Sequence, residues 1–312
     1  MSLSTTPSFD EAERQRALDA LHIVGSLPEP AYDDIVKVAA AVCGTPMALV
    51  TLIDRDRQWF KARTGLDGQQ TDRNVAVCDH AIRQPTELME IGDLNADVRF
   101  ADNPVLNEIG ARFYAGMPLV TETGAAVGSV CVVDVNPREL NTTQREALQA
   151  LARLTMTLME GRSRERGQQV ASILEQGIAD EAAAAPDSAG SYTVVILELQ
   201  DLGALAQRVG ERTLDRHLQQ LDQALEQSLQ PERGDSINRV TGSGEFIAVL
   251  GSDAVDETLA KFRAVAEDIA SRTGAVLLLG AASTNTGESN NVVFLRADRA
   301  LSAAKDAQVS AT

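Results

Sequence analysis

The sequence predicts a mixed α/β protein of two domains, and three observations support this. The chain has 312 residues, about twice the length of a typical domain. Hydrophobic residues make up 44% of it, which supplies enough apolar surface for two cores. Short apolar runs rich in branched residues alternate with longer runs of helical periodicity, a pattern typical of sheets covered by helices. A loop-like stretch at residues 182–191 separates two regions of different patterning.

The composition excludes several classes of protein. The chain carries 28 Lys and Arg residues against 45 Asp and Glu residues, a net charge of −17. Nucleic acids and anionic membranes bind basic surfaces, so neither is an expected partner. The sequence shows neither the long apolar run of a membrane span nor the apolar core of a signal peptide. Because three cysteines are too few for a disulfide framework, we expect a cytoplasmic protein with reduced thiols.

In the first region, the periodicity predicts a central antiparallel sheet flanked by helices. Helices are expected at residues 12–23, 31–42 and 75–83, and strands at 46–54, 57–63, 88–91, 113–120 and 126–133. The last two strands are joined by residues 121–124 as a hairpin. Long connections near residues 65–74 and 93–112 are of the kind that cover a binding pocket.

A long helix is predicted from about Asn141. Thr142 and Thr143 can cap it, with Glu146 as the capping-box partner of Thr143. Residues 160–166 are almost all polar and Gly161 and Gly167 weaken the pattern, but an apolar stripe resumes at Val170. Two interpretations stay open. The segment is either a terminal helix followed by a linker, or a signalling helix that pairs in a dimer.

In the second region, strands again alternate with helices, so we expect a sheet covered by helices on at least one face. Strands are expected at residues 192–199, 236–240, 245–250 and 275–281, and helices at 201–209, 211–229, 255–272 and 291–307. A glycine-rich hairpin tip, Thr241-Gly242-Ser243-Gly244, lets the backbone approach a phosphate, although hairpins favour glycine in any case.

The first 155 residues resemble a GAF domain of the type common in bacterial sensor proteins. The matching segments follow one another through nearly the whole region; they are RAL at 16–18, PMALVTLID at 46–54, RQWFK at 57–61, CDHAI at 78–82, RFADNP at 99–104, RFYAGMPL at 112–119 and GSVCVVD at 128–134. The resemblance implies sensing of a small molecule or cofactor, together with dimerisation. It does not identify the ligand, which varies widely within the family.

Three sets of residues are candidates for binding in this region. The first set is Cys78, His80 and Cys131, whose side chains could bind a soft metal ion or sense an oxidant. The alternative is that the two cysteines are small buried hydrophobic residues and that the histidine is a hydrogen-bonded helix residue. The aromatic candidates for a ligand pocket are Trp59, Phe60, Phe113 and Tyr114, together with Phe100; core packing is the alternative for at least half of them. The third set could contact a polar ligand and consists of Arg99, Asp102 and Asn103. We favour a structural role in which these residues anchor the loop, for example through a salt bridge between Arg99 and Asp97.

Residues 192–310 resemble a GGDEF domain, the catalytic module of diguanylate cyclases. The closing helix carries ADRALSAAK at 297–305, the penultimate core strand ends in LLG at 278–280, and GSGEF at 242–246 falls on the signature loop. The resemblance therefore divides the chain into a GAF domain at 1–158, a helical linker at 159–190 and a degenerate GGDEF domain at 191–312. It also implies a cyclic di-GMP signalling protein that works as a homodimer with a partner signalling protein.

The resemblance assigns a role to each matching position, and several positions depart from the pattern. Members of the family join two GTP molecules into cyclic di-GMP on metal-holding carboxylates. Glu198 stands in place of the first aspartate, and Gly244 replaces the second acid. Ala206 replaces the guanine-binding asparagine, and Ser243 replaces the second signature glycine. The retained nucleotide-binding candidates are Glu198, Asp215, Glu245 and the phosphate-contacting Lys305.

These substitutions all affect the binding of metal and guanine. We therefore expect a vestigial signature loop without catalytic residues or bound metal. The residues of this loop are Gly242, Ser243, Gly244, Glu245 and Phe246. The segment 233–236, Arg-Gly-Asp-Ser, also departs from the Arg-x-x-Asp product-inhibition motif.

Three hypotheses about function follow from the departures. The chain is a non-catalytic relay, a weak or altered cyclase that holds GTP and Mg²⁺ through Glu198 and Glu245, or a nucleotide receptor without turnover. Loss of a carboxylate leaves the triphosphate charge poorly neutralised, which favours the relay.

Overall fold

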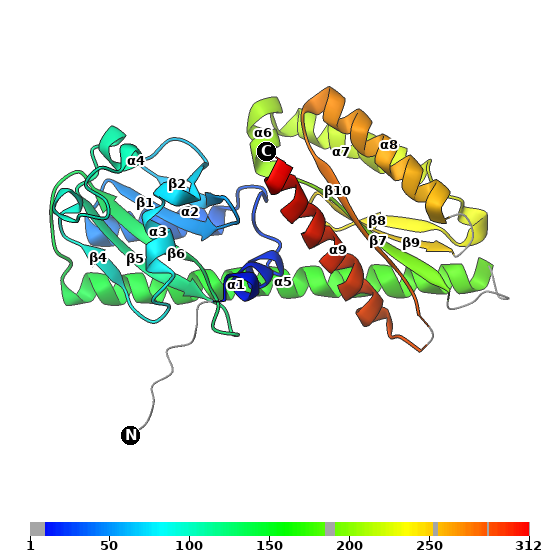
Figure 1. Ribbon diagram of the computed structural model, residues 1–312, viewed down its shortest axis with the longest axis horizontal. Helices are drawn as coiled ribbons and strands as arrows, with labels where there is room; N and C mark the ends of the chain where they lie inside the picture. The colour runs from blue at the N-terminus through cyan, green and yellow to red at the C-terminus, as the bar shows by residue number, and fades with distance from the viewer. Residues whose placement is uncertain (1–9, 185–190, 252–254, 286, 312) are drawn as a thin grey trace, which may run out of the picture. The chain divides into compact units, whose positions relative to one another are not determined.

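The computed structural model describes residues 10–184, 191–251, 255–285 and 287–311, and it forms two compact units (Figure 1). The first unit comprises Met1–Val24 and Pro28–Ser163, and the second comprises Gly25–Leu27 and Arg164–Thr312. Both units are mixed α/β folds, which confirms the predicted fold class. Most of the predicted loop at 182–191, namely residues 185–190, lies outside the described residues.

The first unit contains a six-stranded antiparallel sheet in the order β3-β2-β1-β6-β5-β4. The strands are β1 (Met47–Ile53), β2 (Arg57–Thr64), β3 (Gln70–Asp72), β4 (Met89–Ile91), β5 (Phe113–Val120) and β6 (Ala126–Asp134). The five predicted strands and the hairpin between β5 and β6 are confirmed. Strand β3 was not predicted, because its three residues, Gln70, Thr71 and Asp72, are all polar and give no apolar signal.

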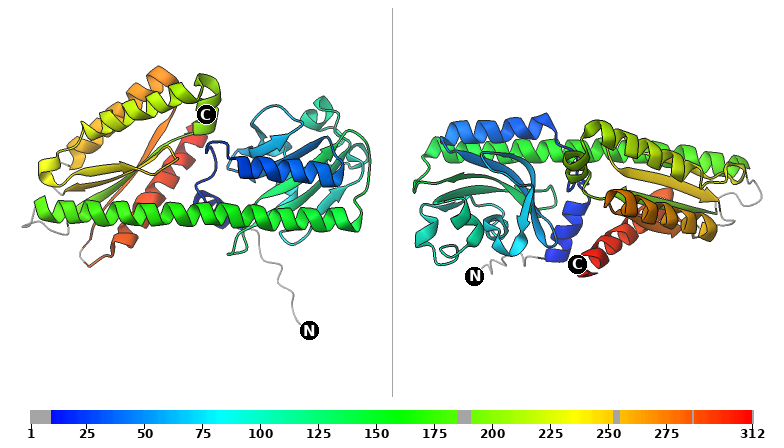
Figure 2. Two further views of the ribbon diagram at one scale, coloured as in Figure 1. Left: turned by 180° about the vertical axis from the view of Figure 1, so that it is seen from behind. Right: turned by 90° about the horizontal axis from the view of Figure 1, so that it is seen from above.

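Helices cover both faces of this sheet. They are α1 (Glu11–Asp19), α2 (Pro30–Cys43), α3 (Val77–Ala81), α4 (Pro104–Glu108) and the first part of α5 (Thr142–Ala184). Apolar residues of α2 and α5 form one core with one face, and those of α3 and α4 form a second core with the other face (Figure 2). Helices α1 and α3 are shorter than predicted, since His22 has a positive φ after α1 and residues 73–75 form a 3₁₀ turn before α3. Helix α4 lies in a connection predicted to be irregular.

Helix α5 begins with a cap that differs from the prediction. The backbone N–H of Gln144 donates to Asn141 Oδ1 and that of Asn141 donates to Gln144 Oε1, both at 3.0 Å. The predicted cap of Thr143 and Glu146 is therefore wrong, because the Asn141–Gln144 pair closes the same type of reciprocal box two residues earlier. Gly161 and Gly167 do not interrupt the helix. Buried residues such as Met159 and Val170 offset the roughly 1 kcal/mol that each glycine costs.

The second unit contains a four-stranded antiparallel sheet in the order β10-β7-β9-β8. Its strands are β7 (Tyr192–Leu199), β8 (Ser236–Arg239), β9 (Glu245–Gly251) and β10 (Leu277–Ser283). Its helices are α6 (Leu202–Val209), α7 (Glu211–Glu226), α8 (Val255–Thr273), α9 (Asn290–Ala311) and the second part of α5. All predicted elements of this region are confirmed, with ends that differ by a few residues.

Both faces of the second sheet are covered. Val195, Leu197 and Leu199 of β7 pack in a core with α6, α7 and α8. The alternating residues Val194 and Ile196 pack instead with α9 and with the second part of α5. Within the part of the chain that the structure describes, no helix is both long and apolar enough to cross a membrane.

Gly128 shows how closely the first sheet is packed, and it gives a test of the fold. A Cβ atom at this position of β6 would lie 1.9 Å from the carbonyl oxygen of Thr51 on the neighbouring strand β1. Since a backbone atom in a central strand cannot move aside, we expect Gly128→Ala to lower the free energy of unfolding by more than about 4 kcal/mol. Urea unfolding followed by circular dichroism measures this.

Gly161→Ala is the matched control. Gly161 lies in α5 with open space around its Cβ position, so alanine is expected to raise the free energy of unfolding by about 0.5–1 kcal/mol. A Gly128→Ala protein within about 1 kcal/mol of the natural protein would show that the described register of β1 and β6 is incorrect.

Candidate functional sites

The signature loop forms the turn between β8 and β9. The backbone N–H of Val240 donates to the carbonyl of Glu245 at 2.9 Å. The hydroxyl of Ser243 donates to the carbonyl of Val240 at 2.9 Å and accepts from the N–H of Glu245 at 3.2 Å. Gly242 has a φ of +72°, a conformation that favours glycine. The turn is therefore internally bonded, and the hydroxyl of Ser243 contributes to its shape.

Phe246, the last residue of the predicted signature loop, belongs to the core instead of the site. It is the second residue of β9, it is paired with Leu197 of β7, and it is only 1% exposed. Its ring packs in the core shared with α6, α7 and α8. Phe246 is therefore a core residue of the predicted strand at 245–250, although it is also the last residue of the signature. Consecutive strand residues point to opposite faces, so Phe246 faces away from the side of the sheet that Glu245 occupies.

Two acidic side chains meet at this end of the sheet. Glu198 lies near the end of β7, directly opposite Glu245 at the start of β9 in the antiparallel pairing. Glu245 is only 3% exposed, and Glu198 is partly buried. Paired residues of neighbouring strands point to the same face of a sheet, so the two carboxylates lie on one face.

Arg166 of α5 forms an ion pair with Glu245. Its Nε donates to Glu245 Oε2 at 2.7 Å, and its Nη2 contacts Glu245 Oε1, so the pair is bidentate. Burial raises the pKa of Glu245, and the guanidinium of Arg166 opposes this shift. Three residues further along α5, Oε1 of Gln169 accepts from the N–H of Thr241 at 3.0 Å. Helix α5 therefore contacts the signature turn in two places, at the side chain of Glu245 and at the backbone N–H of Thr241.

Lys305 of α9 forms an ion pair with Glu198. Its Nζ lies 2.9 Å from the carboxylate, and Gln200 Nε2 donates to Glu198 Oε1 at 2.8 Å. Lys305 and Glu198 were predicted as phosphate and metal contacts, and the structure brings them together as partners of one another. With Glu245, they gather three of the four nucleotide-binding candidates. Asp215, the fourth, is exposed on α7.

Gly244 supplies no side-chain ligand, and the space beside it is filled. A Cβ atom there would lie 3.0 Å from Leu199 Cβ and 3.1 Å from the carbonyl of Leu199. The N–H of Leu199 also donates to the carbonyl of Gly244 at 2.9 Å. Divalent magnesium is held by oxygen ligands that include one or two carboxylates. Both carboxylates of this site, Glu198 and Glu245, are bonded to cationic side chains of the same chain, and Gly244 adds no further oxygen ligand.

Asp235, another acid near the hairpin, anchors a loop. Its carboxylate accepts from the N–H groups of Gln230 at 2.9 Å and Gly251 at 3.0 Å. Burial raises its pKa, which these hydrogen bonds oppose. Asp235 thus holds the ends of two connections together, a structural role that agrees with the predicted departure from the product-inhibition motif.

In the first unit, the candidate pocket residues separate onto the two faces of the sheet. Trp59 and Phe113 lie in the core shared with α2 and α5. Phe60 and Tyr114 lie in the core shared with α3 and α4, where Cys78 and Cys131 join them. Consecutive strand residues point to opposite faces, which explains the division. His80 stands apart, with its ring edge-on to Phe100 at 5.0 Å between centroids.

Three candidates on the long connection between β4 and β5 have identifiable positions. Arg99 forms the predicted salt bridge with Asp97, at 2.5 Å. Asn103 caps α4 and donates from Nδ2 to the carbonyl of Val75 at 2.8 Å. Asp102 is exposed. The predicted salt bridge between Arg99 and Asp97 is therefore confirmed, and Asn103 anchors the same connection.

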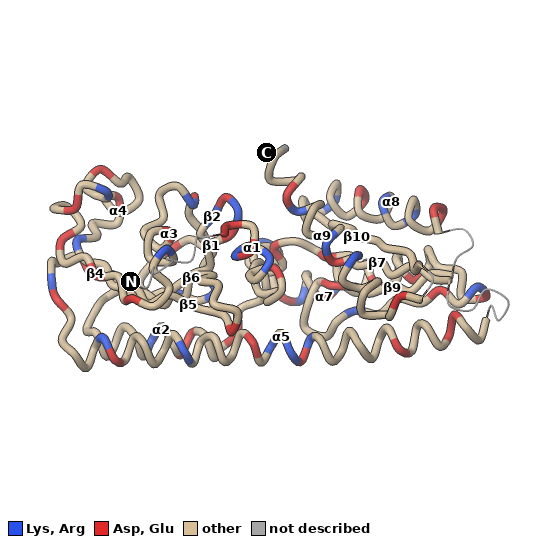
Figure 3. The backbone as a smooth tube through the Cα atoms, turned by 60° about the horizontal axis from the view of Figure 1, so that its bottom comes forward, with Lys and Arg blue, Asp and Glu red and all other residues tan. Residues whose placement is uncertain are grey.

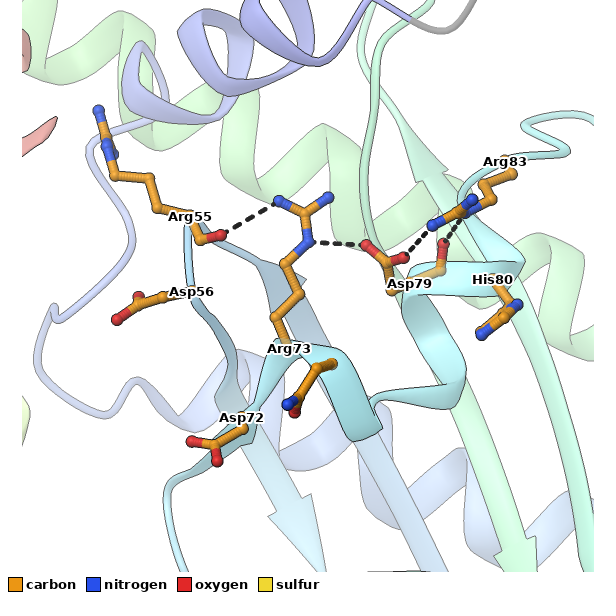
Figure 4. Close-up of a pocket in the computed structure, with 8 residues that line it drawn as sticks. Arg55, Asp56, Asp72, Arg73, Asp79, His80 and Arg83 are labelled. Atoms are coloured by element: carbon orange, nitrogen blue, oxygen red, sulfur yellow. Dashed lines mark hydrogen bonds and ion pairs between the residues drawn. The ribbon is translucent and has the colours of Figure 1, made fainter. Parts of the chain in front are cut away.

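An open polar pocket of about 530 Å³ lies beside α3 (Figure 4). Its lining residues are mostly charged; they are Arg55, Asp56, Asp72, Arg73, Asn74, Asp79, His80 and Arg83. At its centre, Asp79 binds Arg73 at 2.7 Å and Arg83 at 2.7 Å. Of the predicted candidates, His80 lines this pocket. The other lining residues could not be predicted, because charged residues from separate turns share no common spacing.

The Arg166–Glu245 ion pair can be tested by its effect on stability. Removing one member of a buried pair leaves the other charge unpaired in the interior, which costs about 3–5 kcal/mol. We expect Arg166→Met to lower the free energy of unfolding by about that amount, and the double variant Arg166→Met with Glu245→Gln to recover most of the loss. Chemical denaturation of both variants measures the coupling.

Gln168→Met is the control for this pair, since Gln168 is exposed on the same helix. Its effect should stay within about 0.5 kcal/mol. A loss in the double variant that equals the sum of the losses in Arg166→Met and in Glu245→Gln alone would mean that Arg166 and Glu245 do not interact.

Known proteins resemble each part of this chain. A GAF domain model matches residues 28–158, and a model described as diguanylate cyclase, GGDEF domain, matches residues 171–310. Among curated proteins, the cyclic di-GMP phosphodiesterase PA2567 of Pseudomonas aeruginosa is 39% identical over 155 residues, which are 48% of this chain and 26% of that protein. The chain thus spans about a quarter of the length of this relative.

Two solved structures illustrate the similarity of each part. The blue-light absorbing form of the Thermosynechococcus elongatus PixJ GAF domain is 14% identical with a TM-score of 0.38, covering 52% of this chain and 95% of that one. The GGDEF domain of DgcB from Caulobacter crescentus, in complex with c-di-GMP, is 19% identical with a TM-score of 0.37, covering 43% and 82%. From the two domain matches, we conclude that the chain carries a GAF domain followed by a GGDEF domain.

Proposed function

We propose that this chain is a non-catalytic relay in cyclic di-GMP signalling. Its GAF domain senses a small molecule, and its degenerate GGDEF domain passes the state to a partner signalling protein without making cyclic di-GMP. One observation carries the proposal: the two retained acids of the nucleotide site, Glu198 and Glu245, are bonded to Lys305 and Arg166. The relation to a cyclic di-GMP phosphodiesterase supports the choice of pathway.

The chemistry of phosphoryl transfer supports this choice. Metal ions must neutralise the charge that develops on the triphosphate, and they do so from fixed oxygen ligands. At this site a metal would first have to displace Arg166 and Lys305 from their carboxylates, and Gly244 offers no additional oxygen. Ala206 has no side-chain amide with which to bind guanine, unlike the asparagine that it replaces. Metal and base recognition are thus both weakened.

Helix α5 provides a route for the relay. Its first part belongs to the GAF unit, and its second part binds the signature turn through Arg166 and Gln169. A small rotation or shift of this helix would be transmitted to the turn, because both contacts are short and one is buried. Figure 3 shows Lys and Arg interspersed with Asp and Glu along the chain, which supports a protein partner over nucleic acid.

Exposed apolar residues support a homodimer of the chain. Leu154 of α5 is 57% exposed, and Leu158 lies one turn further along the same helix. Val38 and Val42 are exposed on α2, whose C-terminal end accepts hydrogen bonds from Gln144 of α5. We propose that a second copy covers these side chains, as in the signalling-helix interpretation of α5.

Two alternatives use the retained nucleotide-binding candidates. Glu198, Glu245 and Lys305 lie at one end of the sheet, so a weak or altered cyclase would use them to hold Mg²⁺ and GTP. A nucleotide receptor would use Asp215 and Lys305 to bind guanine and phosphate without turnover. These alternatives differ in whether metal is needed and in whether product forms.

The relay proposal predicts no cyclase activity. With GTP and either Mg²⁺ or Mn²⁺, the purified chain is expected to form no cyclic di-GMP above a protein-free control, as measured by liquid chromatography and mass spectrometry. Product that disappears in Glu198→Ala would overturn the relay in favour of the weak cyclase.

Thermal shift measurements with GTP, with and without Mg²⁺, separate the alternatives further. The cyclase alternative requires stabilisation that depends on Mg²⁺ and is lost in Glu198→Ala. Stabilisation without Mg²⁺ and without product identifies the receptor, and calorimetry with a panel of nucleotides then gives its ligand.

The dimer is tested by native mass spectrometry, which also detects a copurified ligand or metal. The natural chain is expected to be dimeric, and the double variant Leu154→Glu with Leu158→Glu to be monomeric, because two carboxylates would be buried against the second copy. Val98→Glu, at a position that is 97% exposed in the loop after β4, controls for added charge. A dimer that survives in the double variant would place the interface elsewhere.

A further inference from the structure

Two cysteines of the GAF domain face each other in its interior. Cys78 lies in the short helix α3 and Cys131 in the central strand β6, and their sulfur atoms are 3.8 Å apart. Both residues are at most 2% exposed. The hydroxyl of Tyr114 on β5 donates to Cys78 Sγ at 3.2 Å. A disulfide has a sulfur–sulfur distance of about 2.0 Å, so these atoms need to approach by about 1.8 Å.

The surroundings make Cys78 the more reactive of the pair. Hydrogen bonding with Cys131 lowers the pKa of the Cys78 thiol to about 6; burial opposes this shift, while Ser129, Thr51 and Tyr114 assist it. The pKa of Cys131 is raised by its hydrogen bond with Cys78 and by burial. The thiolate is the nucleophilic form of cysteine, so Cys78 is the residue that reacts first with an oxidant.

We propose that Cys78 and Cys131 form a reversible disulfide, which makes the GAF domain responsive to small hydroperoxides. The Cys78 thiolate attacks the peroxide oxygen, which gives a sulfenic acid and releases an alcohol or water. The Cys131 thiol then attacks the sulfur of the sulfenic acid, so that a disulfide forms and water leaves. In total the two thiols lose two electrons and two protons, and the peroxide accepts them.

Burial determines which reagents reach the pair. Bulky thiol reagents are excluded, whereas hydrogen peroxide is little larger than water. Once Cys78 is oxidised, its resolving thiol is already in contact, so the second step needs no opening of the core. The third cysteine of the chain, Cys43, is also buried.

The disulfide would act on the neighbouring pocket. Strand β6 is paired on both sides, with β1 and β5, while α3 has five residues and follows a 3₁₀ turn. The approach of the sulfur atoms therefore moves α3 more than the sheet. Asp79 and His80 follow Cys78 directly in α3 and line the charged pocket of Figure 4. Oxidation would thus shift the carboxylate that binds Arg73 and Arg83.

The test is oxidation of the folded, full chain by hydrogen peroxide, followed by intact-mass measurement and peptide mapping without reductant. We expect loss of two hydrogen atoms per chain, a cross-linked pair of peptides that contain Cys78 and Cys131, and full reversal by dithiothreitol. Cys43 is the internal control, because burial raises its pKa to about 11 and it should stay reduced.

Variants separate the two chemical steps. In Cys131→Ser, dimedone should trap a sulfenic acid on Cys78 and no cross-link should form. In Tyr114→Phe, loss of the donated hydrogen bond should raise the pKa of the Cys78 thiol, so the pH at which the oxidation rate reaches half its maximum should shift upward. Hydrogen exchange of α3 should change on oxidation of the natural chain.

Two results would overturn the proposal. One is the absence of the Cys78–Cys131 cross-link in folded protein under conditions that fully oxidise glutathione in a parallel sample. The other is a cross-link that forms only in urea, which would show that the folded core prevents the approach. Neither result depends on the behaviour of a variant or on the function of the GGDEF domain.

Discussion

The proposed role of the second domain depends on the ion pair between Arg166 and Glu245. A buried carboxylate is stable only with a cation or several hydrogen-bond donors beside it. Here the cation comes from α5, so the packing of this helix on the sheet and the charge of the signature turn depend on each other. In the proposed relay, the same contact occupies the one acid that the signature loop retains.

The remainder of the site follows this arrangement. Lys305 neutralises Glu198 on the adjacent strand, and Leu199 packs over the α-carbon of Gly244. A nucleotide site needs open carboxylates at the end of the sheet, whereas a stable core needs closed ion pairs. In the structure, Glu198 and Glu245 are each ion-paired, and this is the physical basis of the proposed relay.

The sequence predicted the sheets well, because buried strands carry strong apolar patterns. It missed β3, whose three residues are all polar, and α4, a five-residue helix that begins with proline inside a long connection. It also misplaced the cap of α5, where two neighbouring polar pairs satisfy the same motif. Arg166 stands in a polar run with no signal for its partner, which lies 79 residues away. The separation of Phe60 from Trp59 follows from strand alternation alone, whereas the meeting of Cys78 and Cys131 depends on how α3 folds over the sheet.

A crystal structure of the chain with a non-hydrolysable GTP analogue and magnesium tests the central claim most directly. We expect the Arg166–Glu245 and Lys305–Glu198 ion pairs to persist, with no metal ion at the turn between β8 and β9. Magnesium ions that bridge the triphosphate to Glu198 and Glu245, with Arg166 and Lys305 displaced, would contradict it.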